Sequence, residues 1–411
     1  MKKSIIVMIV IIICFLSNSV YALELSGNLT YSGSYSPFSK DLSNSLKLEI
    51  KSFHSFTDQI FLEGDLVLRY TDRSSNQPFF IMPKEFYLST YDLIPKVDAK
   101  AGILIESWGS SDMFSPLDNF NPSPFGLSFT EISNKLGVWA ISANYYIDDT
   151  TYLQLVYLPH FVPNHLSEEY EKQLYLGIFA PQFQEQGLEI NSINLTHHIP
   201  DQPVWGVRIG KSFSSFDAYL SYYRGYFLNS YPQQVEPTIN NSGMSLNVNL
   251  GYPKRDILGL EFQGDFPGIE GATLRGDIAY ILPETWVLQG EYLLKDPYFK
   301  ITLGADYTTS SNLYLNLAYV YGLTYEEGTE CSSYLFLNAN QELDHSKLTP
   351  QYIGGISLQD GSMLHSLGFS YDFSDNFSLS LSYLLVIGEE NSKFGQVKNN
   401  EGLFLVGEWS F

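Results

Sequence analysis

Hydrophobic and polar residues alternate with a period of two along most of this chain. From Leu23 to Tyr35 every odd-numbered position is Leu, Gly or Tyr, and every even-numbered position is polar. Consecutive side chains of a β-strand point to opposite faces, so the pattern predicts a strand with one apolar and one polar face. Similar stretches lie at 60–70, 97–106, 137–147, 274–280, 286–294, 313–323, 377–387 and 403–411.

Short turn-forming segments separate many of these stretches. Residues rich in Ser, Asn, Asp and Pro predict turns at 54–58, 213–216, 282–285, 308–312 and 373–377. Longer polar segments, which we expect to be loops, lie at 160–186, 228–242, 326–332 and 389–400. Short turns on one side and long loops on the other are typical of transmembrane β-barrels.

The N-terminus has the pattern of a secretion signal. Lys2 and Lys3 precede an apolar run from Ile5 to Leu16, and Ala22 supplies a small residue for cleavage. The apolar run is shorter than the ~20 residues that a membrane-spanning helix needs. We therefore expect a cleavable signal peptide at 1–22, and any spanning of a membrane to be by strands.

The predicted fold is all-β, a single antiparallel transmembrane β-barrel over residues 23–411. The alternating stretches suggest about 18–20 strands, within a range of 16–22, because single-chain bacterial barrels favour even numbers. The alternative is a soluble β-sandwich or propeller. That alternative leaves the aromatic last residue, Phe411, without an explanation.

Composition excludes several classes of function. The formal net charge of −22 argues against nucleic acid as a partner. After signal removal Cys331 is the remaining cysteine, so an internal disulfide is not expected. The sequence has no nucleophile-elbow, zinc-protease or phosphate-loop motif. We expect no enzymatic activity, no cofactor and no metal site. The alternative is an outer-membrane hydrolase, which would need an accessible Ser or Asp beside a His in the folded protein.

The end of the chain resembles the assembly signal of bacterial outer-membrane β-barrels. Those proteins end in an aromatic residue preceded by hydrophobic residues at alternating positions. The matching residues here are Leu403, Leu405, Trp409 and Phe411, with Gly407 a small departure. The resemblance implies that the barrel-assembly machinery binds this last strand and that the protein lies in the outer membrane.

Alternation stops at residues 107–126. Pro116, Pro122 and Pro124 are incompatible with regular ladder pairing, and Asp112 and Asp118 favour turns. The segment follows a strand that ends near Glu106. It resembles a motif of a poorly characterised porin-like family, in which a strand leads into Trp-Gly, an Asp, Pro-x-Asp and Asn-Pro. The matching residues are Trp108, Gly109, Asp112, Pro116, Asp118, Asn121 and Pro122. The resemblance implies passage of a solute through a membrane.

A long irregular loop in a wide barrel either covers the mouth or folds inside. We expect residues 107–126 to lie in or across the lumen and to set its narrowest opening, and the alternative is a cap over one end. Trp108 is expected to wedge against the wall, with its ring N–H bonded to a polar group. Asp112 and Asp118 either cap backbone amides or pair with wall cations such as Lys100 and Arg69.

Charged residues on the polar face of the predicted strands are expected to face the lumen. An Arg or Lys facing lipid at the midplane would cost about 2–4 kcal/mol. Neighbouring charges either form ion pairs that stiffen the wall or create a transverse field that selects solutes. The residues are Glu63, Asp65, Arg69, Asp98, Lys100, Arg208, Arg275, Asp277, Glu291, Lys300 and Asp306.

Together these features predict a porin-like outer-membrane channel for passive passage of small solutes. Its expected partners are membrane lipid, the assembly machinery and a small-molecule solute, and the sequence leaves the solute and the oligomeric state open. One alternative is a non-transporting surface or structural barrel of adhesin type. Another is a transporter of hydrophobic compounds, which would need an apolar tunnel.

Overall fold

The structure is a computed structural model. It describes residues 23–37, 40, 42–72, 79–112, 114–123, 135–164, 166, 168–184, 189–240, 243–266, 268–343 and 347–411. The signal peptide predicted at 1–22, and Pro124 of the irregular segment, lie outside the described residues.

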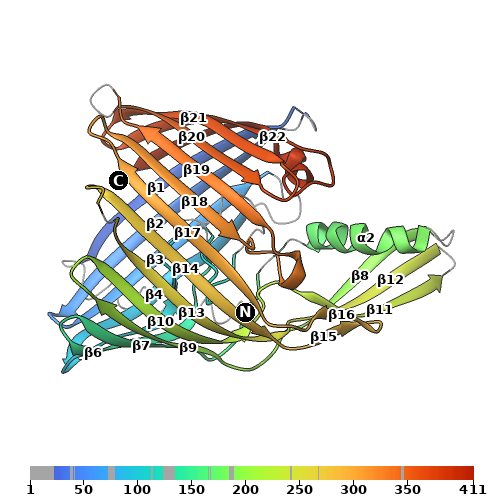
Figure 1. Cartoon of the computed structure of the whole chain (residues 1–411), viewed down its shortest axis with the longest axis horizontal. Helices are drawn as coiled ribbons and strands as arrows, with labels where there is room; N and C mark the ends of the chain where they lie inside the picture. The colour runs from blue at the N-terminus through green and yellow to red at the C-terminus, as the bar shows by residue number, and fades with distance from the viewer. Residues whose placement is uncertain are drawn as a thin grey trace.

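Eighteen antiparallel strands of the described chain form one large sheet that closes into a barrel (Figure 1). Each of them pairs with two neighbours, and with a few exceptions these neighbours are consecutive along the chain. The strands are β1 (Leu23–Tyr35), β2 (Leu42–Thr57), β3 (Ile60–Thr71), β4 (Phe79–Ile94), β5 (Val97–Leu104), β6 (Val138–Asp148), β7 (Thr151–Leu158), β9 (Val204–Ser212), β10 (Phe216–Tyr226), β13 (Lys254–Asp265), β14 (Ala272–Pro283), β17 (Tyr298–Thr308), β18 (Leu313–Tyr321), β19 (Ser333–Gln341), β20 (Leu348–Ser357), β21 (Met363–Ser374), β22 (Phe377–Ile387) and β23 (Gly402–Ser410).

The first and last strands close the barrel by pairing with each other. β1 and β23 are antiparallel, with Leu29 opposite Trp409 and Gly33 opposite Leu405. The backbone groups of Gly27 and Phe411 exchange two hydrogen bonds, each 2.9 Å long. The prediction of an all-β barrel of 18–20 strands is therefore confirmed.

The pairing register separates the two faces of the barrel. Large apolar side chains on one face are 39–63% exposed, and examples are Leu153, Leu260, Leu303, Leu317 and Leu367. The alternate positions carry the polar and charged residues. Since residues opposite each other in an antiparallel pair share a face, the register connects the polar positions of successive strands into one continuous surface. This polar surface lines the lumen, and the apolar one faces outward.

A second, smaller unit projects from the end of the barrel that has the long connections (Figure 1). We call it the extra-barrel layer. It consists of the helix α2 (Glu168–Gln184), a sheet in the order β11 (Tyr231–Asn240), β12 (Gly243–Gly251), β8 (Ile190–His198), and a hairpin of β15 (Trp286–Leu288) and β16 (Glu291–Leu294). The segments 160–186 and 228–242, expected to be loops, therefore contain α2 and β11.

The extra-barrel layer has a core of its own. Tyr175 and Phe179 of α2 pack with Leu246, Val248 and Leu250 of β12. No helix within the described ranges is long and apolar enough to cross a bilayer.

The expected strand 286–294 does not belong to the barrel. Gln289 and Gly290 have φ angles of +52° and +94°, so the chain reverses between β15 and β16. Glu291 lies on this hairpin and is exposed, so its expected place on the lumen wall is wrong. Likewise, residues 282–285 do not join two barrel strands, because they lead from β14 to the hairpin. Alternation continues across the hairpin, which is why periodicity alone did not reveal the reversal.

Two short 3-10 helices complete the described secondary structure. η1 (Gly328–Glu330) lies in the connection before β19, and η2 (Gly395–Asn400) lies in the connection before β23. Both belong to the polar segments that were expected to be loops.

Candidate functional site: the lumen segment

The irregular residues after β5 lie on the polar face of the barrel wall. We call residues 105–112 and 114–123 the lumen segment. Trp108 is only 2% exposed and its ring N–H donates a 3.0 Å hydrogen bond to Gln154 on β7. The guanidinium of Arg208 on β9 lies 5.4 Å from the centre of the same ring. Trp108 therefore fixes the start of the segment against two wall strands.

Two wall carboxylates hold three successive backbone amides of the segment. Asp277 on β14 accepts hydrogen bonds from the amides of Ser110, at 2.9 Å, and Ser111, at 3.0 Å. Glu261 on β13 accepts one from the amide of Gly109, at 3.2 Å. Gly109 has a φ of +108°, and a Cβ there would lie 1.9 Å from the hydroxyl of Ser115. Charge-assisted bonds of this kind are about twice as strong as neutral ones.

The two aspartates of the motif both pair with cations, Asp112 with one on the wall and Asp118 with one beyond the segment. Asp112 pairs with Arg275 on β14, and Arg275 also contacts Asp306 on β17, with 2.8 Å between Nε and Oδ2. Asp118 pairs with Lys135, which lies beyond the segment in the chain. Asp112 thus reaches a wall cation, but neither aspartate pairs with Lys100 or Arg69 in the structure.

Asn121 joins the two ends of the segment. Its side-chain oxygen accepts from the amide of Glu106 at 2.7 Å, and its amide donates to the carbonyls of Leu104 and Leu136 at 2.9 and 2.8 Å. The carbonyl of Pro122 accepts from the amide of Leu136 at 2.8 Å. The chain therefore leaves the wall and returns to it at adjacent points.

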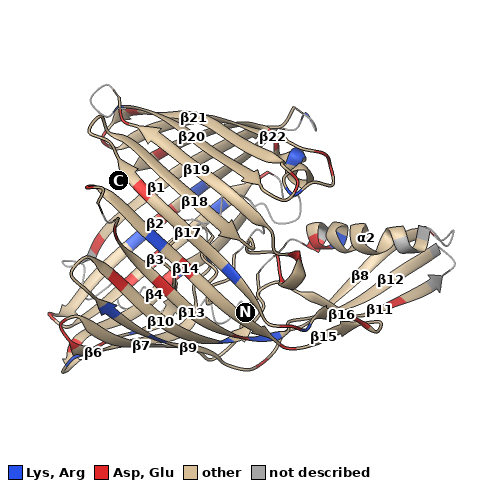
Figure 2. Ribbon diagram, in the orientation of Figure 1, with Lys and Arg blue, Asp and Glu red and all other residues tan. Residues whose placement is uncertain are grey.

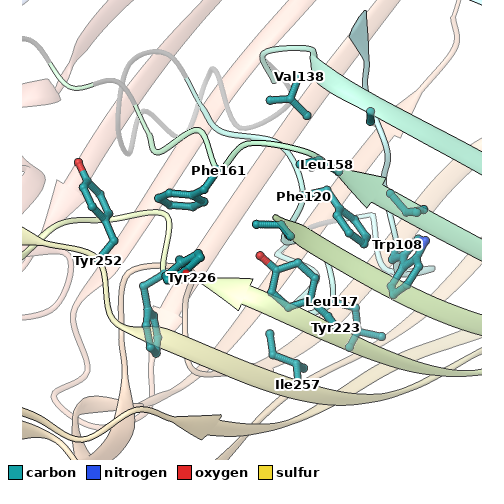
Figure 3. Packing of buried hydrophobic residues seen from close by; sticks show 14 of the residues in the cluster. Trp108, Leu117, Phe120, Val138, Leu158, Phe161, Tyr223, Tyr226, Tyr252 and Ile257 are labelled. Carbon is teal, nitrogen blue, oxygen red and sulfur yellow. The ribbon is translucent and has the colours of Figure 1, made fainter. Parts of the chain in front are cut away.

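Apolar side chains of the segment complete its attachment (Figure 3). Leu117 and Phe120 are almost fully buried against Tyr223 on β10 and Ile257 on β13. Gly206 on β9 leaves room for the rings of Trp108 and Phe120, because a Cβ there would lie 2.7 Å from the first ring and 2.8 Å from the second. The wall is therefore shaped to receive these two aromatic rings.

The segment extends as far as β19. The carbonyl of Phe114 accepts a 2.9 Å hydrogen bond from Thr302 on β17, and the Phe114 ring lies 5.0 Å from that of Phe336 on β19. Its contacts from β7 to β19 are all with the face opposite the exposed leucines. Since the barrel is closed, the segment lies inside the lumen and narrows it.

The register also places the predicted wall charges. All of them except Glu291 lie on the polar face, and Figure 2 shows both signs of charge on strands around the barrel. Arg208 lies 3.3 Å from Glu261, and Lys300 lies 3.0 Å from Glu327. Glu63 accepts from the hydroxyl of Tyr87 at 2.8 Å. The residues on this face are Glu63, Asp65, Arg69, Asp98, Lys100, Arg208, Arg275, Asp277, Lys300 and Asp306.

Sequence reasoning missed several charged residues of the lumen. Glu49 and Glu261 alternate with exposed leucines, so the same periodicity would have found them. Lys84 has no such signal, because β4 contains a β-bulge where Asp65 and Leu66 pair with Glu85 and Pro83. The Lys84 ammonium lies 3.0 Å from Glu49 and 3.3 Å from Asp65. A bulge shifts the phase of alternation, and sequence periodicity does not show it.

Comparisons with known proteins add a likeness to solved structures. No protein-family model and no curated protein matches the sequence. OmpT of Vibrio cholerae with loop L8 deleted, an outer membrane protein, has a TM-score of 0.46 and 9% identity, over 95% of this chain and 99% of that chain. A mutant of the porin of Rh. blastica has a TM-score of 0.45 and 12% identity, over 95% and 100% of the two chains. OmpF of Salmonella typhi, in complex with daunomycin, has a TM-score of 0.45 and 11% identity, over 95% and 97%.

Proposed function

We propose that this protein is an outer-membrane channel for passive diffusion of small polar solutes, without enzymatic activity. One observation carries the proposal. A closed barrel with an apolar outside has a polar, charged inside, and a segment fastened to one part of that inner wall narrows it. Water and hydrophilic solutes are compatible with such an interior, and lipid is compatible with the outer face.

Aromatic residues support the membrane location. Exposed aromatic side chains lie near both ends of the barrel strands, as in the interfacial girdles of membrane barrels. Near the short turns they include Phe56, Tyr91, Tyr145, Phe213 and Phe373. Near the long connections they include Tyr35, Phe79, Trp139, Tyr157 and Phe299.

The polar lumen favours hydrophilic solutes over hydrophobic ones. A transporter of hydrophobic compounds needs an apolar path, whereas Asp65, Lys84 and Glu49 form an ion-pair cluster on the inner wall. Conductance distinguishes the proposed channel from the alternative of a non-transporting surface barrel. Purified protein in a planar bilayer is expected to give discrete current steps. Protein that inserts but never conducts would favour the surface barrel.

We further propose that the lumen segment is the constriction. Because Asn121 bonds the amide of Glu106, a short linker can replace residues 108–119 without straining the ends. This variant is expected to fold and to give a larger single-channel conductance and a higher solute size limit. The matched control replaces residues 287–293 of the β15–β16 hairpin, outside the barrel, and should conduct as the wild type. Equal conductance in all three proteins would show that the segment does not limit the channel.

We propose that export uses the signal peptide at 1–22 and that the last strand directs assembly. The Trp409 and Phe411 side chains are 47% and 49% exposed, and the Phe411 backbone closes the barrel against Gly27. Deleting Phe411 should reduce the amount of folded protein in outer-membrane fractions, and the mature N-terminus should be Leu23. Wild-type amounts of heat-modifiable protein after the deletion would contradict the assembly role.

A further inference from the structure

A buried arginine lines a cavity between the lumen segment and the long connections. Arg255, at the start of β13, is 6% exposed. The cavity, of about 40 Å³, is also lined by Ser115, Asn119 and Thr324 and by three further charged residues, Asp118, Lys300 and Glu327. Arg255 and Lys300 lie near the ends of their strands that carry the long connections, so a solute entering there would meet the cavity on the near side of the segment.

The described residues place no carboxylate in ion-pair contact with Arg255, and the two that line the cavity, Asp118 and Glu327, pair with other cations. Its Nη2 donates a 2.7 Å hydrogen bond to the side-chain oxygen of Asn119, and its Nε is buried without a partner. The guanidinium lies 4.5 Å from the Phe227 ring centre and 6.0 Å from that of Tyr223. Arginine is almost never buried without a charged partner, since desolvating an unpaired charge is costly.

The neighbouring charges do not neutralise Arg255. Lys300 is itself 4% exposed and pairs with Glu327 at 3.0 Å, and the hydroxyl of Tyr298 donates to the same carboxylate. Asp118 pairs with Lys135. Each nearby acid thus has its own cation, and the cavity retains one positive charge.

We propose that this cavity binds the carboxylate group of a small organic acid, through Arg255. A single uncompensated charge suits a monoanion, and the planar guanidinium fork suits a carboxylate. A buried water needs roughly 10–15 Å³ of such volume, so the cavity holds about three water-sized groups, as many as the heavy atoms of a carboxylate. The site names a class of solute for the proposed channel. Transport of that solute rests on the proposed function, whereas binding of the carboxylate does not.

The test measures stabilisation of the protein by ligand, which does not depend on conductance. Thermal unfolding is followed by circular dichroism in neutral detergent at constant ionic strength, with sodium acetate, sodium chloride or sodium phosphate. Acetate should raise the unfolding midpoint above its value in chloride, because a ligand bound only to the folded state stabilises it. Acetamide has nearly the same shape without the charge and should not raise the midpoint.

Two substitutions locate the effect. Arg255→Gln should weaken the acetate response roughly tenfold or more in half-saturating concentration, and Arg255→Lys should keep part of it. Asn119→Asp gives Arg255 a carboxylate partner within the protein, so the acetate response should disappear; the substitution also removes the 2.9 Å hydrogen bond from the Asn119 amide to the carbonyl of Pro116, so the midpoint without ligand is not part of the test. The matched control is Lys211→Gln, which removes a cation from β9 at the opposite end of the barrel from Arg255. This variant should respond to acetate as the wild type does.

Several outcomes would overturn the proposal. One is an equal shift of the unfolding midpoint by acetate and acetamide, and another is an unchanged acetate response in Asn119→Asp. A third is an equal rise of the midpoint with acetate, chloride and phosphate, which would mean that the site binds anions without selecting carboxylates. Should Arg255→Gln fail to fold, Asn119→Asp still decides. In planar bilayers acetate should reduce the potassium chloride current of the wild type but not of Asn119→Asp. A protein that binds acetate but never conducts would contradict the channel and leave the site intact.

Discussion

At the scale of single residues, the lumen segment depends on close fits between rings and glycine. Gly206 faces Trp108 and Phe120 across distances that leave no room for a methyl group. The two rings are held by aromatic contact, with 4.8 Å between their centres and an angle of 84°. Rigid rings cannot yield as a flexible side chain would.

We therefore expect Gly206→Ala to displace Trp108 and destabilise the protein by about 1–3 kcal/mol. The matched control is Gly304→Ala on β17, where a Cβ would meet only the Leu317 carbonyl, at 3.9 Å. The comparison is made by the temperature at which each variant loses its folded migration on a gel. Equal temperatures for the two variants would show that the fit at Gly206 has no energetic importance.

Cys331, in the connection before β19, provides a second test. Burial raises the pKa of its thiol to about 11. Because only the thiolate is nucleophilic, the folded protein at pH 8 should present roughly two hundred times less reactive species than an ordinary cysteine. Reaction with an aromatic disulfide reagent should be slow at pH 8, accelerate towards pH 11, and be fast at pH 8 in denaturant. Equal rates in folded and denatured protein would contradict this burial.

The individual partners of Asp112 and Asp118 could not be predicted from the sequence. A turn-forming aspartate near a wall predicts either a backbone cap or a wall cation, and Asp112 does reach a cation. Its partner Arg275 lies far along the chain, so only the strand register and the path of the segment bring the two together. Sequence spacing contains no information on that path.

At the scale of elements, Asn121 makes the lumen segment a closed loop. Three hydrogen bonds from one side chain join the end of β5, the segment and the approach to β6. Each backbone group left without a partner costs about 1–3 kcal/mol when buried. The Asn121 side chain therefore supplies most of the hydrogen bonds that join the two ends of the segment, beside the backbone bond between Leu136 and Pro122.

We expect Asn121→Ala to loosen the segment while the barrel remains folded. Protease added to the detergent-solubilised protein should cleave within the segment faster than in the wild type, and single-channel currents should become noisier. The control is Asn144→Ala on β6, whose buried side-chain oxygen has no hydrogen-bond partner in the described part of the chain. Cleavage of Asn121→Ala at the wild-type rate would mean that the other anchors suffice.

The elements also divide into those that periodicity reveals and those that it does not. Alternation predicted most barrel strands because one face of the barrel is apolar and the other is polar. It assigned 286–294 to one strand, although the positive φ angles of Gln289 and Gly290 reverse the chain there. It missed α2 because apolar residues lie on both faces of this helix: Tyr175 and Phe179 are buried, whereas Leu174 and Ile178 are exposed, so the sequence has no amphipathic period there.

At the scale of the whole molecule, the two faces of the barrel should differ in their tolerance of charge. Leu367 on β21 is 63% exposed on the outer face, and its neighbour Ser366 lies on the lumen face. Leu367→Arg would place a cation in lipid, at a cost of up to about 2–4 kcal/mol. Ser366→Arg would place it in water.

We expect Leu367→Arg to reduce the amount of folded protein in the membrane and Ser366→Arg to preserve it. The measurement is the folded fraction in outer-membrane preparations, from heat-modifiable migration. Ser366→Arg should also shift ion selectivity towards anions, which gives it a readout of its own. The reverse order of folded fractions would mean that the register of β21 is shifted by one residue.

Sequence predicted the architecture of the whole molecule and its approximate strand number, but not which stretches form the barrel strands. A period of two shows which side chains of a strand share a face. The number of barrel strands depends instead on which stretches pair within the barrel sheet and which form separate hairpins or sheets. β8, β11 and β12 have ordinary strand sequences and form a separate sheet. Only the complete set of pairings distinguishes them from the barrel.

The bond between the first and last barrel strands has one further consequence. A closed ring has no edge strand, because each described barrel strand has a neighbour on both sides. Open edges do remain in the extra-barrel layer, where β8 and β11 each have a neighbour on one side in the sheet. Any strand exchange or fibre-like stacking between folded copies would therefore begin in that layer, beyond the bilayer, and removing the layer should suppress it.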